Sequence, residues 1–248
     1  MRILVLGEAC VDEFVYGRID RICPEAPVPV LNPIETVENP GMAGNTVANL
    51  KALVPSAQIG HVHQNETIRK TRFVEKKSNQ MVVRVDSGED NLEPLIWTPS
   101  MDVMLGQADI VVVSDYNKGF LSNAHIKEIA KKSVLSIIDS KRKLTNDLIE
   151  GYTFVKLNEK ERLNNPTLTT DNIITTLGSE GAEYQNVLFP SPNPQETIDV
   201  SGAGDTFVAS FISKYFTTKD VRQSIHFANK MSAQVVSKKG VVTPILDD

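Results

Sequence analysis

Short apolar runs that alternate with helical patterns constrain the fold of this 248-residue chain more than any other feature. The run Asp109–Ser114 has four consecutive apolar residues at its centre, which is typical of a strand buried on both faces. The same reasoning predicts strands at Arg2–Leu6, Leu135–Asp139, Thr153–Leu157 and Asn172–Leu177, and helices at Asn45–Leu53, Ile126–Lys132, Ala203–Thr217 and Val221–Lys238. Strands that alternate with helices form parallel sheets, so we expect an α/β fold with a doubly wound, mostly parallel sheet flanked by helices.

Four further segments have a different pattern. Val28–Val37 is rich in β-branched residues but is interrupted by prolines, so it suits an edge strand or a ribbon. Thr71–Glu75 and Met81–Asp86 partly alternate between apolar and polar residues, which predicts strands of a sheet covered on one face. Gly181–Phe189 is predicted to form a hairpin. Because the sequence has no repeat, low-complexity segment or interdomain linker, we expect residues 1–248 to form a single domain.

The composition argues against several classes of function. Lys and Arg number 26 and Asp and Glu 31, so the net charge of −5 gives no reason to expect a nucleic acid or an anionic membrane as partner. Cys10 and Cys23 form neither a disulfide framework nor a zinc pattern, which favours a reducing compartment. The apolar run that begins at Met1 is too short for a signal peptide or a membrane-spanning helix. We therefore expect a cytoplasmic protein.

The segment Asp199–Thr206 predicts a phosphate-binding site. Gly202, Ala203 and Gly204 lie where an apolar helix begins, and the first amides of a helix have no intrahelical partner. These amides and the helix dipole favour an anion. Asp205 would repel a phosphate there unless it had a chemical task, and the natural task is that of a general base. The alternative is a glycine turn before a core helix with a solvated capping aspartate.

The string Asp-Val-Ser-Gly-Ala-Gly-Asp-Thr resembles the C-terminal signature of the PfkB/ribokinase family of carbohydrate kinases, which usually reads D-T-x-G-A-G-D. The resemblance implies a ribokinase-like kinase domain that uses ATP and Mg²⁺ to phosphorylate a hydroxyl of a sugar or sugar phosphate. It also implies a small β-sheet lid, built from residues of about 11–37 and 70–87. Asp205 would be the base, and the amides of Gly202, Ala203 and Gly204 would hold charge on the transferred group.

Two stretches near the N-terminus, Ile22–Val30 and Pro40–Leu50, resemble one branch of this family, the kinase domain of bacterial ADP-heptose synthesis. Its pattern is close to R-I-S-P-E-A-P-V-P-V followed by P-G-G-A-A-N-V-A. The branch phosphorylates the anomeric hydroxyl of a heptose 7-phosphate. The chain departs from the pattern at Met42, where the branch has Gly, and at Gly44, where it has Ala.

Four residues of this region are candidates to bind the sugar. Asn45 offers both a donor and an acceptor to a polyol, and Asp12 can accept bonds from two hydroxyls. Gly41 and Gly44 allow a ligand to approach the backbone closely.

Ser114–Gly119 follows a buried strand and resembles the S-D-Y-G-K-G of the same branch. Ligands bind at the carboxyl ends of parallel strands, so Lys118 is the candidate to hold a substrate phosphate. The alternative is a solvated lysine in a turn, which is the usual state of lysine.

The nucleotide site is predicted mainly from the resemblance. Asn158 and Glu161 match an N-x-x-E in which the glutamate organises Mg²⁺, although an acidic helix start explains them as well. Thr176, Gly178 and Gly181 match a T-x-G-x-x-G that lines the nucleotide, although a hairpin entry would have the same glycines. Three further matches are Asp139-Ser140-Lys141, which resembles D-x-K, and Asn229 and Lys238-Lys239-Gly240, which fall where the family closes around adenine.

Other assignments fit the sequence less well. It has neither the P-loop pattern nor a G-x-G-x-x-G after the first strand. His61 and His63 have no partner cluster and are expected to be exposed strand residues rather than metal ligands. Gly60–His63 is not the H-x-G-H of nucleotidyltransferases, so a second, adenylyl-transferring domain is not expected.

The segments 53–71 and 161–172 are short for the family, which suggests a compact member. The alternatives left open are a family kinase for another sugar, sugar phosphate or nucleoside, and a catalytically silent homologue that binds sugar or nucleotide. Family members often pair through their lids, and a homodimer through the lid would fit the proline-broken ribbon.

Overall fold

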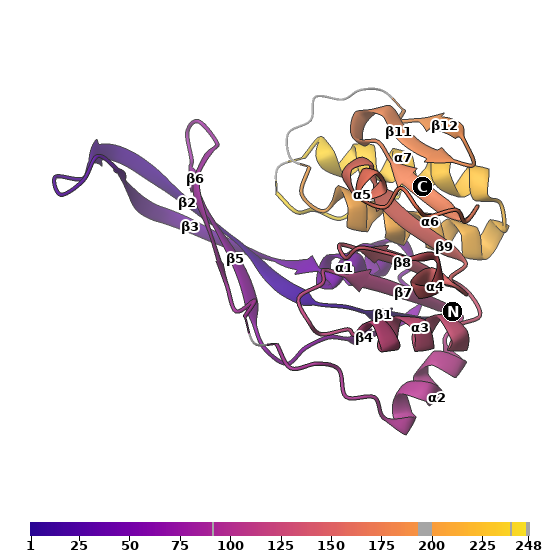
Figure 1. The fold of residues 1–248 in the computed structure, drawn as a ribbon. Coiled ribbons are helices and arrows are strands. Elements are labelled where there is room, and N and C mark those ends of the chain that lie inside the picture. Colours follow the sequence, from indigo (N-terminus) through magenta and orange to yellow (C-terminus); the bar gives the residue numbers. More distant parts are fainter. Residues whose placement is uncertain (91, 193–199, 239, 247–248) are drawn as a thin grey trace.

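The computed structural model describes residues 1–90, 92–192, 200–238 and 240–246, which form two sheets and the helices around the larger one (Figure 1). The larger sheet has the strand order β12-β11-β10-β9-β8-β7-β1-β4 within these residues. The smaller sheet, with the order β3-β2-β5-β6, projects from the main body as an arm.

Six neighbouring strands of the larger sheet run parallel, as expected: β1 (Arg2–Leu6), β4 (Gln58–Val62), β7 (Ile110–Asp115), β8 (Ser136–Ser140), β9 (Phe154–Asn158) and β10 (Ile173–Thr176). The expected hairpin forms an antiparallel edge of two strands, β11 (Gly181–Tyr184) and β12 (Val187–Pro190). The prediction of a mostly parallel α/β sheet is therefore confirmed.

Helices cover both faces of this sheet because its strands are apolar on both sides. Ile3 and Val5 of β1 pack with α1 (Ala43–Leu53), α6 (Ala203–Thr218) and α7 (Val221–Val236). Leu4 and Leu6 point to the other face and pack with α2 (Pro99–Gln107), α3 (Asn123–Lys132) and α4 (Asn146–Ile149). The remaining short helices, α5 (Glu159–Asn164) and the 3₁₀ turn η1 (Gly178–Glu180), follow the carboxyl ends of β9 and β10. No helix within the described ranges is long and apolar enough to cross a membrane.

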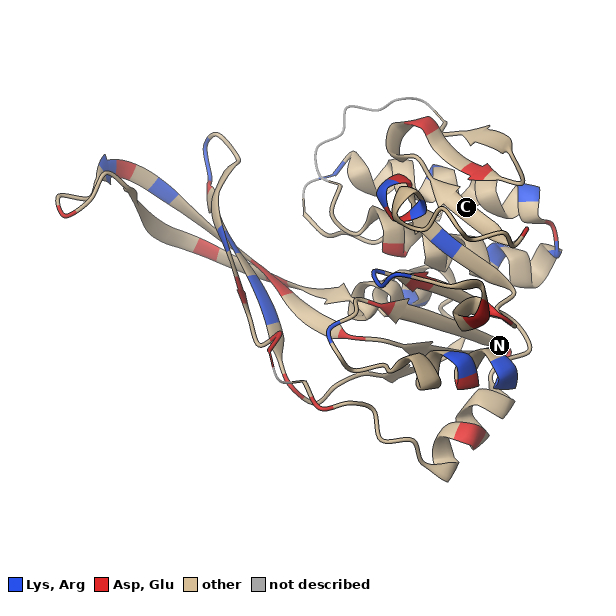
Figure 2. Cartoon of the chain, in the orientation of Figure 1, with Lys and Arg blue, Asp and Glu red and all other residues tan. Residues whose placement is uncertain are grey.

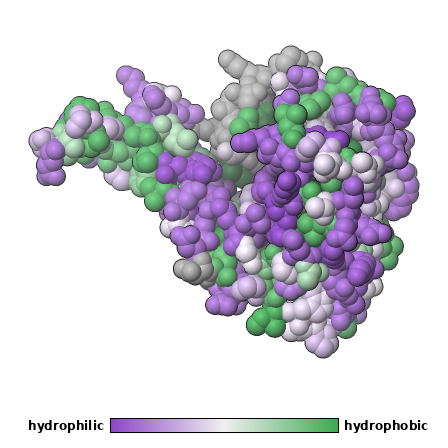
Figure 3. All heavy atoms as spheres, in the orientation of Figure 1, coloured by the Kyte–Doolittle hydropathy of each residue, from purple (hydrophilic) through white to green (hydrophobic). Residues whose placement is uncertain are grey.

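The arm consists of β2 (Ala9–Ile22), β3 (Pro29–Met42), β5 (Ile68–Glu75) and β6 (Gln80–Ser87). β3 lies at one edge, where prolines cost no ladder hydrogen bond, so the expectation of an edge strand there is confirmed. The expectation that β6 is covered on one face is wrong, because every residue of β6 is exposed. Apolar atoms along the arm are visible at the surface in Figure 3.

Several elements were not expected from the sequence, among them β4, α2 and α4. β4 lies in the short segment after α1, which therefore has a strand but no helix before β5. α2 precedes β7 and buries Met101 and Leu105. In the second short segment, α5 ends at Asn164, and no strand separates it from β10.

Candidate active site

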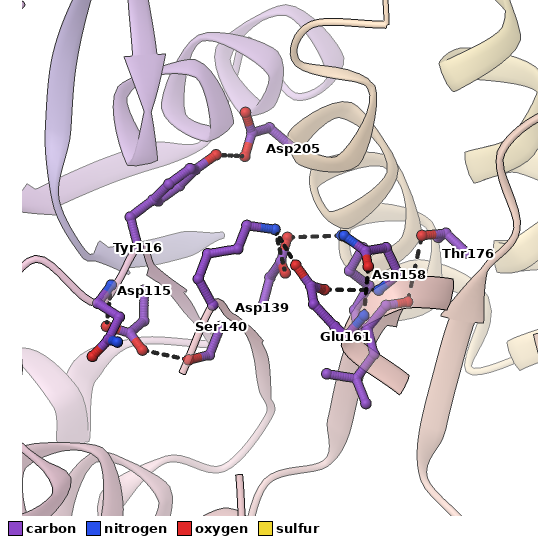
Figure 4. Close-up of polar contacts among 12 residues, drawn as sticks. Asp115, Tyr116, Asp139, Ser140, Asn158, Glu161, Thr176 and Asp205 are labelled. Atoms are coloured by element: carbon purple, nitrogen blue, oxygen red, sulfur yellow. Dashed lines mark hydrogen bonds and ion pairs between the residues drawn. The ribbon is translucent and has the colours of Figure 1, made fainter. Parts of the chain in front are cut away.

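The predicted catalytic residues meet where the parallel strands end. The carboxyl ends of β7, β8, β9 and β10 and the N-terminus of α6 border a cleft of about 1030 Å³, including open solvent at its mouth. Its lining includes Tyr116, Asp139, Lys156, Asn158 and Asp205. Figure 4 shows the polar contacts among these and neighbouring residues.

Asp205 is the most buried carboxylate that faces this cleft, with 6% of its surface exposed. Its Oδ2 accepts a hydrogen bond from Asn45 Nδ2 at 2.9 Å. Its Oδ1 accepts bonds from the Tyr116 hydroxyl at 3.1 Å and the Thr46 hydroxyl at 3.4 Å. Burial raises the pKa of Asp205 from 3.8 to about 6, although the bond from Asn45 opposes the shift. A carboxylate with this pKa is ionised at pH 7 and is a better base than an exposed aspartate.

The start of α6 is closely packed at its two glycines, and most tightly at Gly202. Gly202 is the N-cap with φ 79°, and a Cβ there would lie 2.5 Å from Asn45 Nδ2. A Cβ on Gly204 would lie 3.1 Å from Lys156 Nζ. The amide of Ala203 donates to the Val200 carbonyl at 3.3 Å, whereas those of Gly204 and Asp205 begin the helix without intrahelical acceptors. Asp199, the first residue of the motif, lies outside the described residues.

Lys156 is a site residue that sequence analysis missed. It is 2% exposed within β9, and its Nζ contacts Asp139 Oδ2 at 3.0 Å. Burial alone raises the pKa of Asp139, but the charges of Lys156 and Lys141 outweigh burial and lower it. A buried ammonium beside Gly204 therefore adds positive charge at the start of α6.

Asn158 and Glu161 form the capping box of α5. The Asn158 side chain accepts from the Glu161 amide, and the Glu161 side chain accepts from the Asn158 amide, each at 2.8 Å. Lys141 donates to the other oxygen of Glu161. In this structure Asn158 and Glu161 therefore serve as an acidic helix start, the alternative to a magnesium motif.

The same region fits a magnesium ion that arrives with a nucleotide. Asp139 Oδ1 is buried without a hydrogen-bond partner, and Lys141 Nζ lies 3.9 Å from it while binding Glu161. Mg²⁺ needs one or two carboxylates when waters and phosphates complete its shell, and Asp139 and Glu161 provide two.

The predicted sugar-binding residues lie at the base of the arm. Asp12 is buried, and its Oδ1 accepts from Arg72 Nη1 at 2.5 Å. A Cβ on Gly41 would lie 2.2 Å from Asp12 Oδ2, so glycine is needed for this placement. A Cβ on Gly44 would meet Pro40 at 3.4 Å, an ordinary contact, so the Ala of related sequences would fit there. Asn45 contacts Asp205 directly, as described above.

Lys118 lies in an ion-pair cluster rather than in free solvent. Its ammonium donates to Glu89, which also pairs with Lys70 Nζ at 3.2 Å. Lys70 belongs to β5, whose basic residues form blue bands on the arm in Figure 2.

Glu8, which sequence analysis also missed, fixes the loop that carries Lys118. It is fully buried, and its carboxylate accepts from the amides of Tyr116, Lys118 and Phe120 at 2.8, 3.0 and 3.3 Å.

A second pocket of about 780 Å³ adjoins the cleft and contains the predicted nucleotide residues. Thr176, Gly178, Gly181 and Asn229 line it, and Gly204 belongs to both cavities. Asn229 Nδ2 donates to the Phe189 carbonyl at 2.8 Å, so this side chain also ties α7 to β12. Lys239 of the predicted adenine turn lies outside the described residues.

The histidine pair lies away from this site. The rings of His61 and His63 have centroids 4.4 Å apart. His63 is exposed as expected but follows the end of β4, whereas His61 lies in β4 and is half-buried, and burial lowers the pKa of its imidazole to about 4. No group of three His, Cys, Asp or Glu side chains able to hold a metal is found in the part of the chain that the structure describes.

A family profile and two curated relatives are similar to this chain over most of its length. The profile described as pfkB family carbohydrate kinase matches residues 50–248. A bifunctional protein HldE from a Nitratiruptor species is 29% identical, and the match covers 100% of this chain and 64% of that protein. The HldE protein of Gluconacetobacter diazotrophicus is also 29% identical, with 97% and 61% covered. The chain therefore spans less than two thirds of the length of these curated relatives.

Solved structures share the fold at lower identity. An Arabidopsis thaliana ribokinase complexed with ribose and ATP is 17% identical with a TM-score of 0.71, covering 96% of this chain and 93% of that one. Escherichia coli phosphofructokinase-2 in complex with potassium is 16% identical with a TM-score of 0.74, covering 98% and 95%.

Proposed function

Because the chain belongs to the pfkB family of carbohydrate kinases, we propose that it transfers the γ-phosphate of ATP to the anomeric hydroxyl of a heptose 7-phosphate. A member of this family is a phosphotransferase with an alcohol acceptor. The acceptor is proposed from the stretches Ile22–Val30 and Ser114–Gly119, which resemble the heptose branch.

The observation that supports a phosphorylated acceptor is the pair Lys70 and Lys118. Both ammonium groups converge on the carboxylate of Glu89, and Lys70 Nζ also lies 6.0 Å from the ring of Tyr116, which contacts Asp205. Two lysines that share one anion close to the base can instead hold the phosphate of a substrate. A sugar without a phosphate would leave both lysines paired only with Glu89.

Asp205 takes the proton of the accepting hydroxyl in this proposal. The oxygen then attacks the γ-phosphorus, and the leaving group is ADP. Asp12, Asn45 and the glycines Gly41 and Gly44 position the sugar at the base of the arm.

The start of α6 stabilises the charge that develops on the transferred phosphoryl group. Gly202 and Gly204 allow the backbone to approach it, and the first amides of the helix and the ammonium of Lys156 supply positive charge. The amide of Ala203 donates to the Val200 carbonyl, so it would have to break this bond to join them. Glu161 and Asp139 would hold Mg²⁺, which would supply positive charge to neutralise the nucleotide phosphates.

The nucleotide occupies the pocket that Thr176, Gly178, Gly181 and Asn229 line, and Asn158 lines the adjoining cleft together with the base. The arm, with the segments 11–37 and 70–87, acts as the lid of a single kinase domain and excludes water that would otherwise accept the phosphoryl group. We place the reaction in the cytoplasm, where ATP is available and the free Cys10 and Cys23 stay reduced.

A second copy of the chain is the proposed partner of the arm. The arm exposes Met81, Val82, Val83 and Val85 of β6 and Ile34 and Val37 of β3. An exposed apolar patch can be buried against the same patch of an identical chain across a twofold axis.

The test measures ADP release from Mg·ATP with heptose 7-phosphate, the unphosphorylated heptose, fructose 6-phosphate, ribose and a nucleoside. We expect turnover with heptose 7-phosphate and much less with the unphosphorylated heptose. Asp205→Asn is expected to fold and bind ATP but to lose about 10²–10⁴-fold in kcat, because it cannot accept the proton.

Asp220→Asn is the matched control, since Asp220 caps α7 outside the cleft and asparagine is also a good cap. Near-normal turnover of Asp205→Asn would remove Asp205 as the base. If another acceptor were preferred, the proposal of a kinase would stand and the proposal of heptose 7-phosphate as its substrate would be wrong.

A further inference from the structure

Tyr116 is held in place at its backbone before its side chain enters the site. Its amide donates to Glu8 Oε2 at 2.8 Å, and Glu8 is fully buried. The preceding residue, Asp115, is bound by Arg142 through two nitrogens at 2.6 and 2.9 Å. If the backbone at Tyr116 moved, the buried carboxylates of Glu8 and Asp115 would lose hydrogen bonds. The position of this backbone is therefore well determined.

The ring of Tyr116 is fixed by a second set of contacts. It packs against Cys10, Met42, Ile68 and Leu92, the apolar cluster at the base of the arm. The ammonium groups of Lys70 and Lys141 lie 6.0 and 5.8 Å from the ring centroid, which adds cation–π attraction.

The hydroxyl of Tyr116 acts as a donor to Asp205. It lies 3.1 Å from Oδ1, and Figure 4 shows the side chain pointing directly at the carboxylate. Burial, followed by the charges of Asp205 and Asp139, raises the pKa of Tyr116 well above 10. The phenol therefore keeps its proton over the working range of an enzyme.

An ionised carboxylate has about four sites for hydrogen-bond donors. Asn45 occupies one on Oδ2, and Tyr116 and Thr46 occupy those on Oδ1. One site on Oδ2 remains for the hydroxyl of a substrate. We propose that Tyr116 is a positioning residue for Asp205, which orients the carboxylate so that its free lone pair faces the accepting hydroxyl. This inference rests on the proposed function, in which Asp205 is the base.

The bond from Tyr116 also favours the ionised form of Asp205. Burial raises the pKa of Asp205, and the hydrogen bonds from Asn45 and Tyr116 and the charge of Lys156 lower it. The other titratable groups that act on Asp205 are Asp139 of β8, Lys141 after β8, and Cys10 of β2. None of them changes when Tyr116 is replaced by phenylalanine, so removing the phenol should raise the pKa of Asp205.

The experiment follows the ionisation of Asp205 directly by ¹³C NMR of aspartate-labelled protein, with its signal assigned by its loss in Asp205→Asn. The midpoint is expected near pH 6 in the unaltered chain. In Tyr116→Phe it is expected about one pH unit higher. The acidic limb of the pH profile of kcat/KM should shift by the same amount as this midpoint. At pH values above the limb, kcat should fall about tenfold, while the KM for ATP stays unchanged.

Tyr152→Phe is the matched control. Tyr152 is also buried, and its hydroxyl donates to the Ile126 carbonyl at 2.9 Å, outside the cleft. This variant should change neither the NMR midpoint of Asp205 nor the acidic limb of the pH profile of kcat/KM. Equal midpoints in Tyr116→Phe and the unaltered chain would overturn the proposal.

The NMR titration needs no turnover, so the two proposals can fail separately. A midpoint that moves in Tyr116→Phe, in a protein without turnover on any acceptor, supports the contact and overturns the proposed function. Turnover with a fixed midpoint overturns the role of Tyr116 and leaves the proposed function intact.

Discussion

The ionisation of Asp205 links its proposed role as the base to the stability of the fold. It is 6% exposed, and burial raises the pKa of its carboxyl from 3.8 to about 6. An acid whose pKa is higher in the folded state holds its proton more tightly there than in the unfolded chain. Its contribution to stability is therefore complete below about pH 4 and is lost as pH rises through about 6. A shift of about two units corresponds to roughly 3 kcal/mol.

We expect this linkage to appear in the difference between the unaltered chain and Asp205→Asn. As pH falls from 7.5 to 4, the free energy of unfolding of the unaltered chain should rise relative to the variant by up to about 3 kcal/mol. Urea titrations at several pH values measure it, and groups that titrate in both proteins cancel in the difference. A difference that does not vary with pH would contradict the shift in pKa.

Other site residues show what a sequence can and cannot reveal. The positions of Gly202 and Asp205 at the start of a helix were predictable, because glycines before a helical pattern have a local physical reason. Glu8 was not, because its role depends on amides more than 100 residues away, and a charged residue after an apolar strand has the same pattern as an ordinary turn. Lys156 interrupts an apolar strand, and only the neighbouring strand reveals its partner, Asp139.

At the scale of elements, the start of α1 contains local strain. Met42 is the N-cap residue of α1 with φ 54° and ψ −135°, a conformation that is rare for residues other than glycine. Its side chain is buried against Tyr116, Cys10 and Ile68. Where the related branch has Gly, this chain has Met42, which gains apolar packing at the cost of backbone strain.

The strain predicts an unusual order of stability among variants. Met42→Ala and Met42→Gly both lose the packing, but only Met42→Gly also relieves the backbone. We expect Met42→Gly to be more stable than Met42→Ala by about 1–2 kcal/mol, measured by urea unfolding. Ala48→Gly in the interior of α1 should show the ordinary order, a loss of about 1 kcal/mol. If Met42→Ala were the more stable of the two, the backbone at Met42 would not be strained.

The helices and strands that could be predicted from the sequence are those with many buried residues. β7 was evident because it is apolar throughout and covered on both faces. β4 is an edge strand with polar and glycine positions, and α2 buries only Met101 and Leu105, so neither has a strong periodic signal. The pattern of β6 indicated one covered face, but coverage depends on what packs against a strand, and within the described residues nothing covers β6.

At the scale of the whole molecule, the exposed arm predicts an assembly. We expect the chain to be a dimer in sedimentation experiments, and Val83→Glu to be a monomer because it places a charge in the apolar surface of β6. Gln80→Glu adds the same charge at the end of β6 and should remain a dimer. A monomeric unaltered chain at micromolar concentration would exclude this use of the arm.

The hydrogen bond between Asn45 and Asp205 joins residues 160 positions apart, and that between Thr206 and Asn49 spans 157. Contacts of such high sequence separation form late, because a long loop must close before they contribute. A nascent chain therefore holds a complete first strand and most of the arm long before it has a working base. Under the proposed function, phosphoryl transfer requires residues up to 206 to have left the ribosome, so chains shorter than this cannot consume ATP by this route.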